Sequence, residues 1–411
     1  MKKMILICLV VSCVNLFLNA DLLSEFIEIG LENSLDIQDA NRNLKNEKSS
    51  LNSNYFNLLP SFSASLNSSK NFDDNDNFSN SASLQISKTF QLNEPNFYSI
   101  KTAIWNMKSA ELSLQQNRKQ IAFNIFSDYL MILETQENLQ IQQENFKMQT
   151  KIFNFIKAQF EIGEKSKLEF QQSKIDLINY EIAITETKNH IHQLRNTFFS
   201  LLKIEDDNKL FSELQIDFNE IDIEFNTNLT LLQNQNNLKI SELSLLQNKI
   251  DFLPSLSLSY SLAFNDENSV YEFENYQRNS NSISISASYN IFNLLGKRET
   301  YLRAKRDLRV RKLQYDNLLT NEKNKLQNLH NDLVTAQKTL VLYEQKLQLA
   351  TENLQMAEKQ FTFGNLGLIE LDRIKIEHQN SQVTKNQKIY SLLKIRQSIN
   401  LLLSRKILGK W

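Results

Sequence analysis

Glycine, proline and cysteine are all scarce in this chain of 411 residues, which has six glycines, three prolines and two cysteines. An average protein of this length has roughly thirty glycines and twenty prolines. Because these two residues end and redirect secondary structure, the elements of this chain must be few and long. Rossmann folds, TIM barrels and other turn-rich enzyme folds are therefore nearly excluded.

Neither sign of charge dominates, since 46 basic and 47 acidic residues give a net charge of −1. Nucleic acid is not an expected partner, because binding its phosphates requires a clear basic excess. The sequence has no HExxH, phosphate-loop, GxSxG or GxGxxG pattern. Its four histidines have no metal-ligand spacing: His190, His192, His330 and His378. We therefore expect no enzyme activity, no catalytic or metal-binding residues and no cofactor.

The first twenty residues have the features of an export signal. Two lysines precede an apolar stretch at 4–18, and we expect cleavage after Ala20. Both cysteines, Cys8 and Cys13, lie inside this segment, so the mature chain has no disulfide or thiolate metal site. A lipoprotein in which Cys13 is acylated is the alternative. No later run of eighteen apolar residues occurs, so any membrane span is expected to be β.

Two pairs of similar segments indicate an internal duplication. QFEIGEKSKLEFQQSK at 159–174 resembles QFTFGNLGLIELDRIK at 360–375, and NLLPSFSASL at 57–66 resembles DFLPSLSLSY at 251–260. The expected organisation is a signal peptide at 1–20, a first repeat at 21–204, a linker at 205–226, a second repeat at 227–404 and a tail at 405–411.

Each repeat is predicted to contain a helix, a β-hairpin, a long helix and a returning helix. Apolar residues alternate with small polar residues in the predicted hairpins at 61–92 and 255–292, which is typical of strands with one apolar face. The remaining stretches have apolar residues three and four apart and few breakers. Helices are expected at 24–58, 96–160, 166–203, 227–252 and 296–361, with a last one running from Gly367 to about 403.

Four strands with an apolar face indicate membrane insertion, but they cannot close a barrel within one chain. Open strand edges are not tolerated in lipid, so several chains are required. Two chains give eight strands, too few for an aqueous channel, and three give twelve. The predicted fold class is mainly α with membrane β. The long-helix hairpins are duplicated in tandem, and four strands per protomer contribute to a trimeric 12-stranded outer-membrane β-barrel.

Three kinds of feature occur in a fixed order along the chain. They are the helix-to-strand junctions at Pro60 and Pro254, the strand-to-helix turn YNIFNLLGKRETYLRAK at 289–305, and the duplicated glycine turns. Together they resemble the TolC family of outer-membrane efflux proteins over essentially the whole mature chain. The resemblance implies a homotrimer in the outer membrane whose long-helix hairpins form an α-barrel that extends into the periplasm. There it docks on a periplasmic adaptor (membrane fusion) protein and an inner-membrane pump.

The function implied by the resemblance is that of a passive exit duct, which exports drugs or other small molecules in a tripartite efflux system. The outer-membrane component of type I protein secretion is an alternative with the same architecture. A trimeric coiled-coil adhesin is a second alternative. Such an adhesin should concentrate its strands at the C-terminus, whereas the predicted hairpins of this chain are internal and duplicated.

Site residues follow from the resemblance. The turns that would dock the adaptor contain Gly163, Leu168, Gly364, Leu366, Gly367 and Leu368. The constriction of the periplasmic entrance would contain Glu370, Asp372 and Arg373. Arg373 stands where the family has a second acid. Either Asp372 substitutes for that acid, or Arg373 pairs with a carboxylate of a neighbouring protomer. The leucines of both turns are expected to face water.

A cluster of eight basic residues lies between 297 and 312, just below the expected barrel. It consists of Lys297, Arg298, Arg303, Lys305, Arg306, Arg309, Arg311 and Lys312. Two roles are open: binding anionic headgroups at the inner leaflet, or lining the tunnel.

Overall fold

The structure is a computed structural model that describes residues 22–70, 78–88, 95–206, 211, 224–225, 227–265 and 277–407. The expected signal peptide, with Cys8 and Cys13, lies outside the described residues. So do most of the expected linker at 205–226 and the last four residues of the tail.

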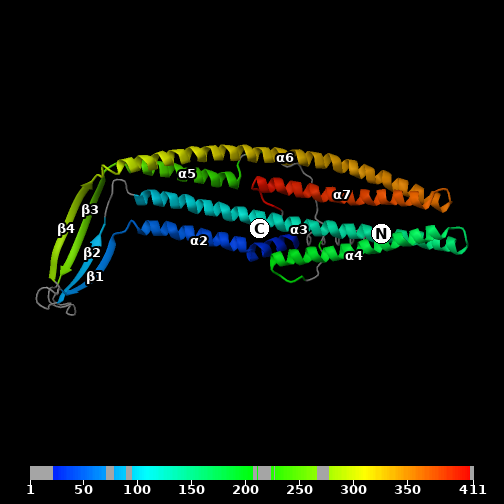
Figure 1. The fold of residues 1–411 in the computed structure, drawn as a ribbon, viewed down its shortest axis with the longest axis horizontal. Coiled ribbons are helices and arrows are strands. Elements are labelled where there is room, and N and C mark those ends of the chain that lie inside the picture. Colours follow the sequence, from blue (N-terminus) through cyan, green and yellow to red (C-terminus); the bar gives the residue numbers. More distant parts are fainter. Residues whose placement is uncertain are drawn as a thin grey trace, which may run out of the picture. The chain divides into compact units, whose positions relative to one another are not determined.

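The described chain is mainly helical, with two β-hairpins (Figure 1). A helix at 22–33 precedes the labelled elements. These are α2 (Leu35–Phe56), β1 (Ser61–Lys70), β2 (Phe78–Ser87), α3 (Pro95–Glu161), α4 (Lys167–Leu202), α5 (Leu229–Ile250), β3 (Ser255–Asn265), β4 (Gln277–Ser288), α6 (Leu294–Thr362) and α7 (Leu368–Leu402).

The two long helices have nearly the predicted limits. α3 contains 67 residues and α6 contains 69, and each end lies within two residues of the expected position. Pro95 occupies the first position of α3, where its missing N–H has no hydrogen bond to make. At about 1.5 Å per residue, each helix is roughly 100 Å long.

The first predicted helix, 24–58, is divided in two, which corrects the expectation of one continuous helix. The break lies at Ser34, between the helix at 22–33 and α2. The Ser34 hydroxyl accepts a hydrogen bond from the backbone N–H of Ile37 at 3.4 Å, and Asp36 lies in the first turn of α2. A serine cap followed by an acid is a helix-start signal, so Ser34 begins a second helix.

The strands form two antiparallel hairpins, β1 with β2 and β3 with β4. The register places apolar residues opposite one another, as in the pairs Leu258 with Ile285 and Tyr260 with Ile283. Such cross-strand pairs stabilise a ladder. Ile283 and Ile285 nevertheless remain more than 70% exposed within one chain. β2 lies beside β3 (Figure 1), so the two hairpins are neighbours.

Both hairpins end earlier than predicted. β2 ends at Ser87, and residues 89–94 lie outside the described chain. β4 ends at Ser288 instead of 292, because the side chain of Asn290 accepts a hydrogen bond from the backbone N–H of Asn293 at 3.2 Å. This local bond closes a turn and ends the extended backbone. Ile291 and Phe292 therefore lie in the turn before α6, where they are exposed.

The chain divides into two compact units that cut across the sequence repeats. The helical unit comprises Met1–Gln38, Gln115–Asn228 and Asn321–Trp411. The strand unit comprises Asp39–Leu114 and Leu229–Thr320 and contains all four described strands. Each unit draws segments from both predicted repeats. Among the described residues, no helix has the length and apolar character required to cross a membrane.

The core of the helical unit is rich in aromatic side chains from distant parts of the sequence. Its central rings are Phe26, Tyr129, Phe198, Phe199 and Phe211. The guanidinium of Arg195 lies 5.0 Å from the Phe211 ring centre and donates hydrogen bonds to Asp206. A cation over an aromatic face is a favourable contact. Together with the hydrogen bonds, it holds Asp206 and Phe211 against α4.

Candidate functional site

The turns between α3 and α4 and between α6 and α7 have the same backbone geometry. Gly163 has a φ of +83° and Gly364 has a φ of +77°. In each turn, the N–H that follows the glycine donates to a carbonyl five residues earlier: Glu164 to Gln159 at 2.9 Å, and Asn365 to Gln360 at 2.8 Å. This is the left-handed glycine termination of a helix, and it occurs at equivalent positions of both repeats.

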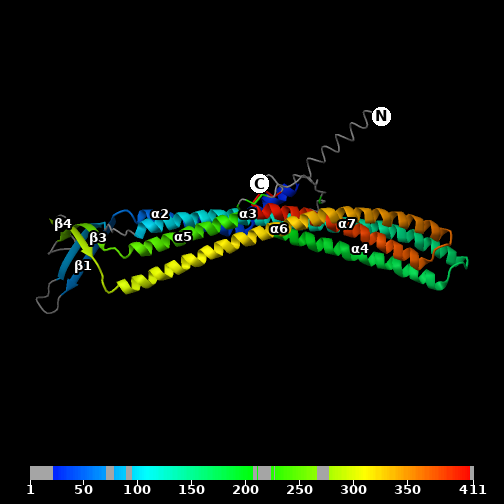
Figure 2. The same ribbon diagram turned by 90° about the horizontal axis from the view of Figure 1, so that it is seen from above.

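The two turns lie at the same end of the helical unit, as Figures 1 and 2 both show. Side chains join them: the Lys165 ammonium of the first turn lies 5.6 Å from the Phe361 ring centre of the second. Beneath them a buried cluster contains Ile156, Ala357, Phe361, Leu368 and Leu371. The turns therefore rest on one shared apolar core.

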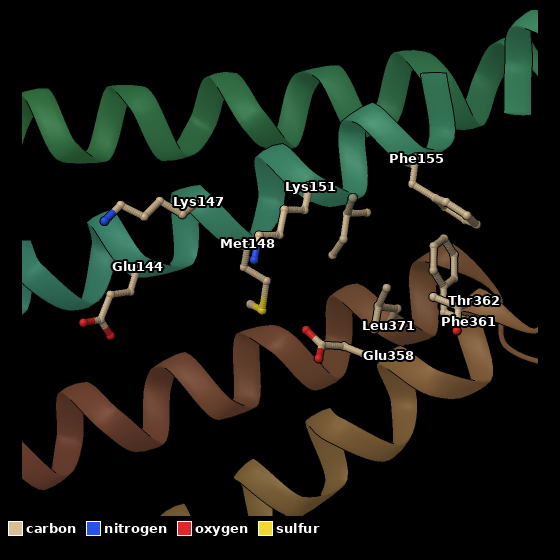
Figure 3. A pocket seen from close by; sticks show the side chains of 10 residues that line it. Glu144, Lys147, Met148, Lys151, Phe155, Glu358, Phe361, Thr362 and Leu371 are labelled. Atoms are coloured by element: carbon tan, nitrogen blue, oxygen red, sulfur yellow. The ribbon is translucent and has the colours of Figure 1, made fainter. Parts of the chain in front are cut away.

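A groove of about 500 Å³ lies between α3, α6 and α7 below the turns (Figure 3). Phe155 of α3 and Phe361 of α6 face one another across it, with ring centres 5.9 Å apart. Leu371 of α7 also lines the groove and is fully buried. Burial of Leu371 fixes the rotation of α7, so that the side chains of Glu370 and Arg373 point outward and are exposed.

The helices after the two turns begin differently. Ser166 caps α4: its hydroxyl accepts from the Glu169 N–H at 3.2 Å, and the Glu169 carboxylate accepts from the Ser166 N–H at 3.0 Å. Gly367 occupies the equivalent position before α7 and has no side chain to cap it. Glu370 therefore has no serine partner, and Arg373 binds it instead, at 2.7 Å.

Both equivalent carboxylates are held in their charged form. A hydrogen bond from Lys165, together with the bond from the Ser166 N–H, lowers the pKa of Glu169. A hydrogen bond from Arg373 lowers the pKa of Glu370. Binding to the ionised carboxylate explains the direction of both shifts.

The three residues of the predicted constriction lie on the first turns of α7. Arg373 donates to both oxygens of Glu370 within one chain, whereas Asp372 pairs with Lys375 at 2.7 Å. Successive helix positions differ by about 100°, so Asp372 points about 200° away from Glu370. The side chains of Glu370 and Arg373 therefore lie on one face of α7, and the side chain of Asp372 lies on another.

Asp372 belongs to a polar cluster between α3, α4 and α7 that sequence reasoning did not find. Lys375 is buried and donates to Gln149 of α3 as well as to Asp372. Burial raises the pKa of Asp176 of α4, and the negative charge of the nearby Asp372 raises it further. The cluster joins three helices, and only their packing could reveal it.

The predicted docking residues are placed unequally. Leu168 is exposed, but Leu368 is buried at 5% exposure and Leu366 is half-buried against the same cluster. The expectation that all three leucines face water was wrong for Leu368, because Phe361 and Leu371 cover it. The side chain that follows, Ile369, is exposed instead.

Four apolar side chains project from the two turns into solvent. They are Ile162 and Leu168 in the first turn and Phe363 and Ile369 in the second, with exposures of 71%, 75%, 79% and 83%. Ile162 corresponds to Phe363, and Leu168 corresponds to Ile369, each 201 residues further along the chain. Sequence analysis missed Ile162, Phe363 and Ile369. Their recurrence beside both turn glycines was the available signal.

The family model described as outer membrane efflux protein matches residues 26–202. No curated protein sequence matches the chain. Several solved structures share its fold. The Campylobacter jejuni CmeC outer membrane channel has a TM-score of 0.80 and 16% identity, and the match covers 93% of this chain and 85% of CmeC.

The Vibrio cholerae outer membrane protein VceC has a TM-score of 0.85 and 14% identity, with 94% of this chain and 96% of VceC covered. The open state of the Neisseria gonorrhoeae MtrE outer membrane channel has a TM-score of 0.81 and 14% identity, and the match covers 93% of this chain and 89% of MtrE. The family match and the shared fold together account for nearly all of the described chain. The chain is therefore similar to the outer membrane efflux protein family over residues 26–202, and it shares the fold of these outer membrane channels.

Proposed function

We propose that the protein is an outer-membrane channel-tunnel and serves as the passive exit duct of a tripartite efflux system for drugs or other small molecules. The observation that carries this proposal is the pair of neighbouring hairpins whose apolar residues are paired in register and yet exposed, as at Ile283 and Ile285. An apolar strand face that stays exposed in one chain suits contact with lipid. The similarity of residues 26–202 to the outer membrane efflux protein family agrees with a transport role.

Three copies of the chain complete the channel in this proposal. The described strands form two two-stranded sheets, each with unpaired edges, and lipid offers no hydrogen bonds to satisfy these edges. A trimer closes twelve strands into one barrel, and its helices form an α-barrel in the periplasm. Glu370, Asp372 and Arg373 then surround the entrance of the tunnel, with one set contributed by each protomer.

The exposed apolar tips of the two turns would dock a periplasmic adaptor protein, which connects the duct to an inner-membrane pump. Ile162, Leu168, Phe363 and Ile369 offer apolar contact area at one end of the helical unit. Apolar side chains held in water are favourable sites for burial by a partner. Gly163 and Gly364 hold these tips in place through their left-handed backbone.

Two measurements on the detergent-purified full chain test this function. Native mass spectrometry should give three chains per particle, and insertion into planar lipid bilayers should give discrete ion-conducting steps. A stable folded monomer would contradict the proposal, since its strand edges would be unpaired. Deletion of the gene should also sensitise cells to exported compounds, and re-expression should restore resistance.

A further inference from the structure

Five cations form a stripe along one face of α6 in the strand unit. They are Arg298, Lys305, Arg306, Arg309 and Lys312. At about 100° per residue, these five positions fall within a sector of about 120° around the helix axis. They extend over about 21 Å of the helix, and no acid falls within the sector between 298 and 312. We name these five residues the cationic stripe.

The cationic stripe is exposed and almost unpaired. All five side chains are exposed. Arg298 reaches Glu299 only at 3.9 Å, and among the described residues the other four form no ion pair. The first turn of α6 contains no acid that could offset their charge. Five like charges concentrated in this way indicate an anionic partner.

The residues just before the stripe are apolar and exposed. Phe292 is 97% exposed and Leu295 is 75% exposed, and both lie between β4 and the first cation of the stripe. α3 begins in the same way at the strand end of this unit (Figure 1). There Lys101 lies 5.2 Å from the ring centre of Phe97, and Lys108 lies 4.5 Å from that of Trp105. An apolar and aromatic border followed by cations is typical of a membrane–water interface.

We propose that the cationic stripe binds the phosphate groups of anionic lipids in the leaflet that faces the periplasm. The inference rests on the proposed function, because that function places the strands in the bilayer and the start of α6 at its surface. Positive side chains near a membrane attract anionic headgroups, and the attraction fades within a Debye length. The stripe thereby fixes the depth at which the channel sits in the membrane.

Distances along the helix indicate that the N-terminal part of the stripe, next to the exposed apolar residues, makes the contact with lipid. The headgroup layer on one side of a bilayer is about 5–7 Å thick, and the Debye length at physiological salt is about 8 Å. Cations within about 15 Å of the apolar border can therefore act. Arg306 lies about 12 Å along the helix from Arg298, whereas Lys312 lies about 21 Å away. Arg298, Lys305 and Arg306 should matter most, and Lys312 least.

The same helix supplies a matched control. Arg303 and Arg311 lie outside the sector and line a groove between α5 and α6. The double variants K305Q/R306Q and R303Q/R311Q therefore remove the same number of charges from the same stretch. Native mass spectrometry should first show that both variants keep the oligomeric state of the wild type. Each is then titrated in detergent micelles with phosphatidylglycerol, and separately with zwitterionic phosphatidylcholine.

K305Q/R306Q should bind phosphatidylglycerol about twenty-five-fold more weakly than the wild type, at about fivefold per cation. R303Q/R311Q should bind it as the wild type does, and phosphatidylcholine binding should be unchanged in both. Equal losses in the two variants would overturn the proposal, since the effect would then follow net charge alone. So would normal phosphatidylglycerol binding by K305Q/R306Q.

Channel recordings in bilayers of uncharged lipid separate this proposal from the function on which it rests. A wild-type protein that conducts in no bilayer defeats the channel assignment, whatever the lipid titration gives. An altered cation-to-anion selectivity in K305Q/R306Q, with phosphatidylglycerol binding intact, shows that the stripe faces the water-filled duct. That result overturns the lipid site and leaves the channel function standing.

Discussion

Arg373 binds both carboxylate oxygens of Glu370 one helical turn away, with its Nη2 lying 2.7 Å from Oε1. In the equivalent turn of the first repeat, Glu169 is bound by Lys165 and by the cap residue Ser166. The two repeats thus hold the same carboxylate with different partners. Removing Arg373 touches no helix cap, whereas Glu169 would still be bound by the cap residue Ser166 if Lys165 were removed.

Arg373→Gln should therefore release Glu370 as an unpaired anion. The pKa of Glu370 should rise toward its ordinary range, because the hydrogen bonds that lower it are lost. If three copies surround the entrance as proposed, block of the channel by multivalent cations should tighten by at least about tenfold, the low end of the effect of charge focusing. Single-channel recordings at pH 7 measure the block directly.

Asp372→Asn is the control for this experiment, because Asp372 points away from Glu370 and pairs with Lys375. It should leave the block by multivalent cations unchanged. If Asp372→Asn alters the block while Arg373→Gln does not, the constriction belongs to Asp372, and the role proposed for Glu370 is wrong.

Gly364→Val should strain the second turn. Its φ of +77° disfavours any side chain, and the space around it is open, so the cost is in the backbone alone. A β-branched residue in this conformation costs about 1–3 kcal/mol. We expect efflux to fall while the channel still assembles, as judged by protein level and native mass. Gly367→Ala is the matched control, since its φ of −76° suits any residue. Normal efflux by Gly364→Val at a normal protein level would contradict the entrance role of this turn.

Element limits were largely predictable because the chain has so few breakers. Gly163 and Gly364 are the turn glycines, and Pro95 starts a long helix. Ser34 was missed because a serine cap inside an apolar helical pattern is a local signal that competes with the periodicity around it. Long-range packing did not decide these limits, so the sequence sufficed for most of them.

Side-chain partners were predictable only over short distances. The pair of Glu370 and Arg373 has the i,i+3 spacing that favours ion pairs on a helix. Leu368 was misplaced because three apolar residues follow Gly364 closely, and only contact with Phe361 determines which is buried. The meeting of Asp176 with Asp372 joins residues almost 200 positions apart. No local pattern contains that information.

Gly30→Val should destabilise the helical unit. A Cβ at this position would lie 2.3 Å from Cδ1 of Ile125 and 2.9 Å from Cδ2 of Leu202, and both of these residues are fully buried. Overpacking of a closed core costs about 1–3 kcal/mol. Thermal unfolding should therefore begin at a lower temperature. Gly296→Val is the control: nothing lies within 4 Å of its Cβ position, so the transition should stay near that of the wild type. Equal transitions for the two variants would show that the close packing at Gly30 has no energetic effect.

The contact between α4 and α7 should strengthen as the pH falls from 7 toward 4. Burial and Asp372 raise the pKa of Asp176 in the folded chain above its unfolded value of about 3.9. A carboxyl whose folded pKa is raised loses stability as the pH rises between these two values, and regains it on acidification. Hydrogen exchange of the α4 amides, corrected for the intrinsic effect of pH, should show greater protection near pH 4, at the unfolded value, than at pH 7.

Asp176→Asn should abolish this pH dependence, because the substituted side chain does not titrate. Lys375 on α7 remains to pair with Asp372, and Tyr180 of α4 keeps its hydrogen bond to Gln379 at 3.2 Å. Burial lowers the pKa of His378 on α7, which acts in the opposite direction below about pH 6.5, and His378→Gln separates the two effects. An unchanged pH profile in Asp176→Asn would assign the dependence to another group.

Replacing the exposed apolar tips should weaken docking of the adaptor without disturbing the channel. Phe363 and Ile369 are about four-fifths exposed in the free chain, so a change to serine removes little internal packing. A large apolar side chain contributes about 1.5–3 kcal/mol when a partner buries it fully, so the double variant F363S/I369S should lose at least about a hundredfold in affinity for the adaptor. I162S/L168S makes the equivalent change in the first turn, and each double variant should reduce efflux. Native mass and single-channel conductance should stay as in the wild type, which separates lost docking from lost assembly. Full efflux by a chain with all four replacements would show that the adaptor does not bind through these turns.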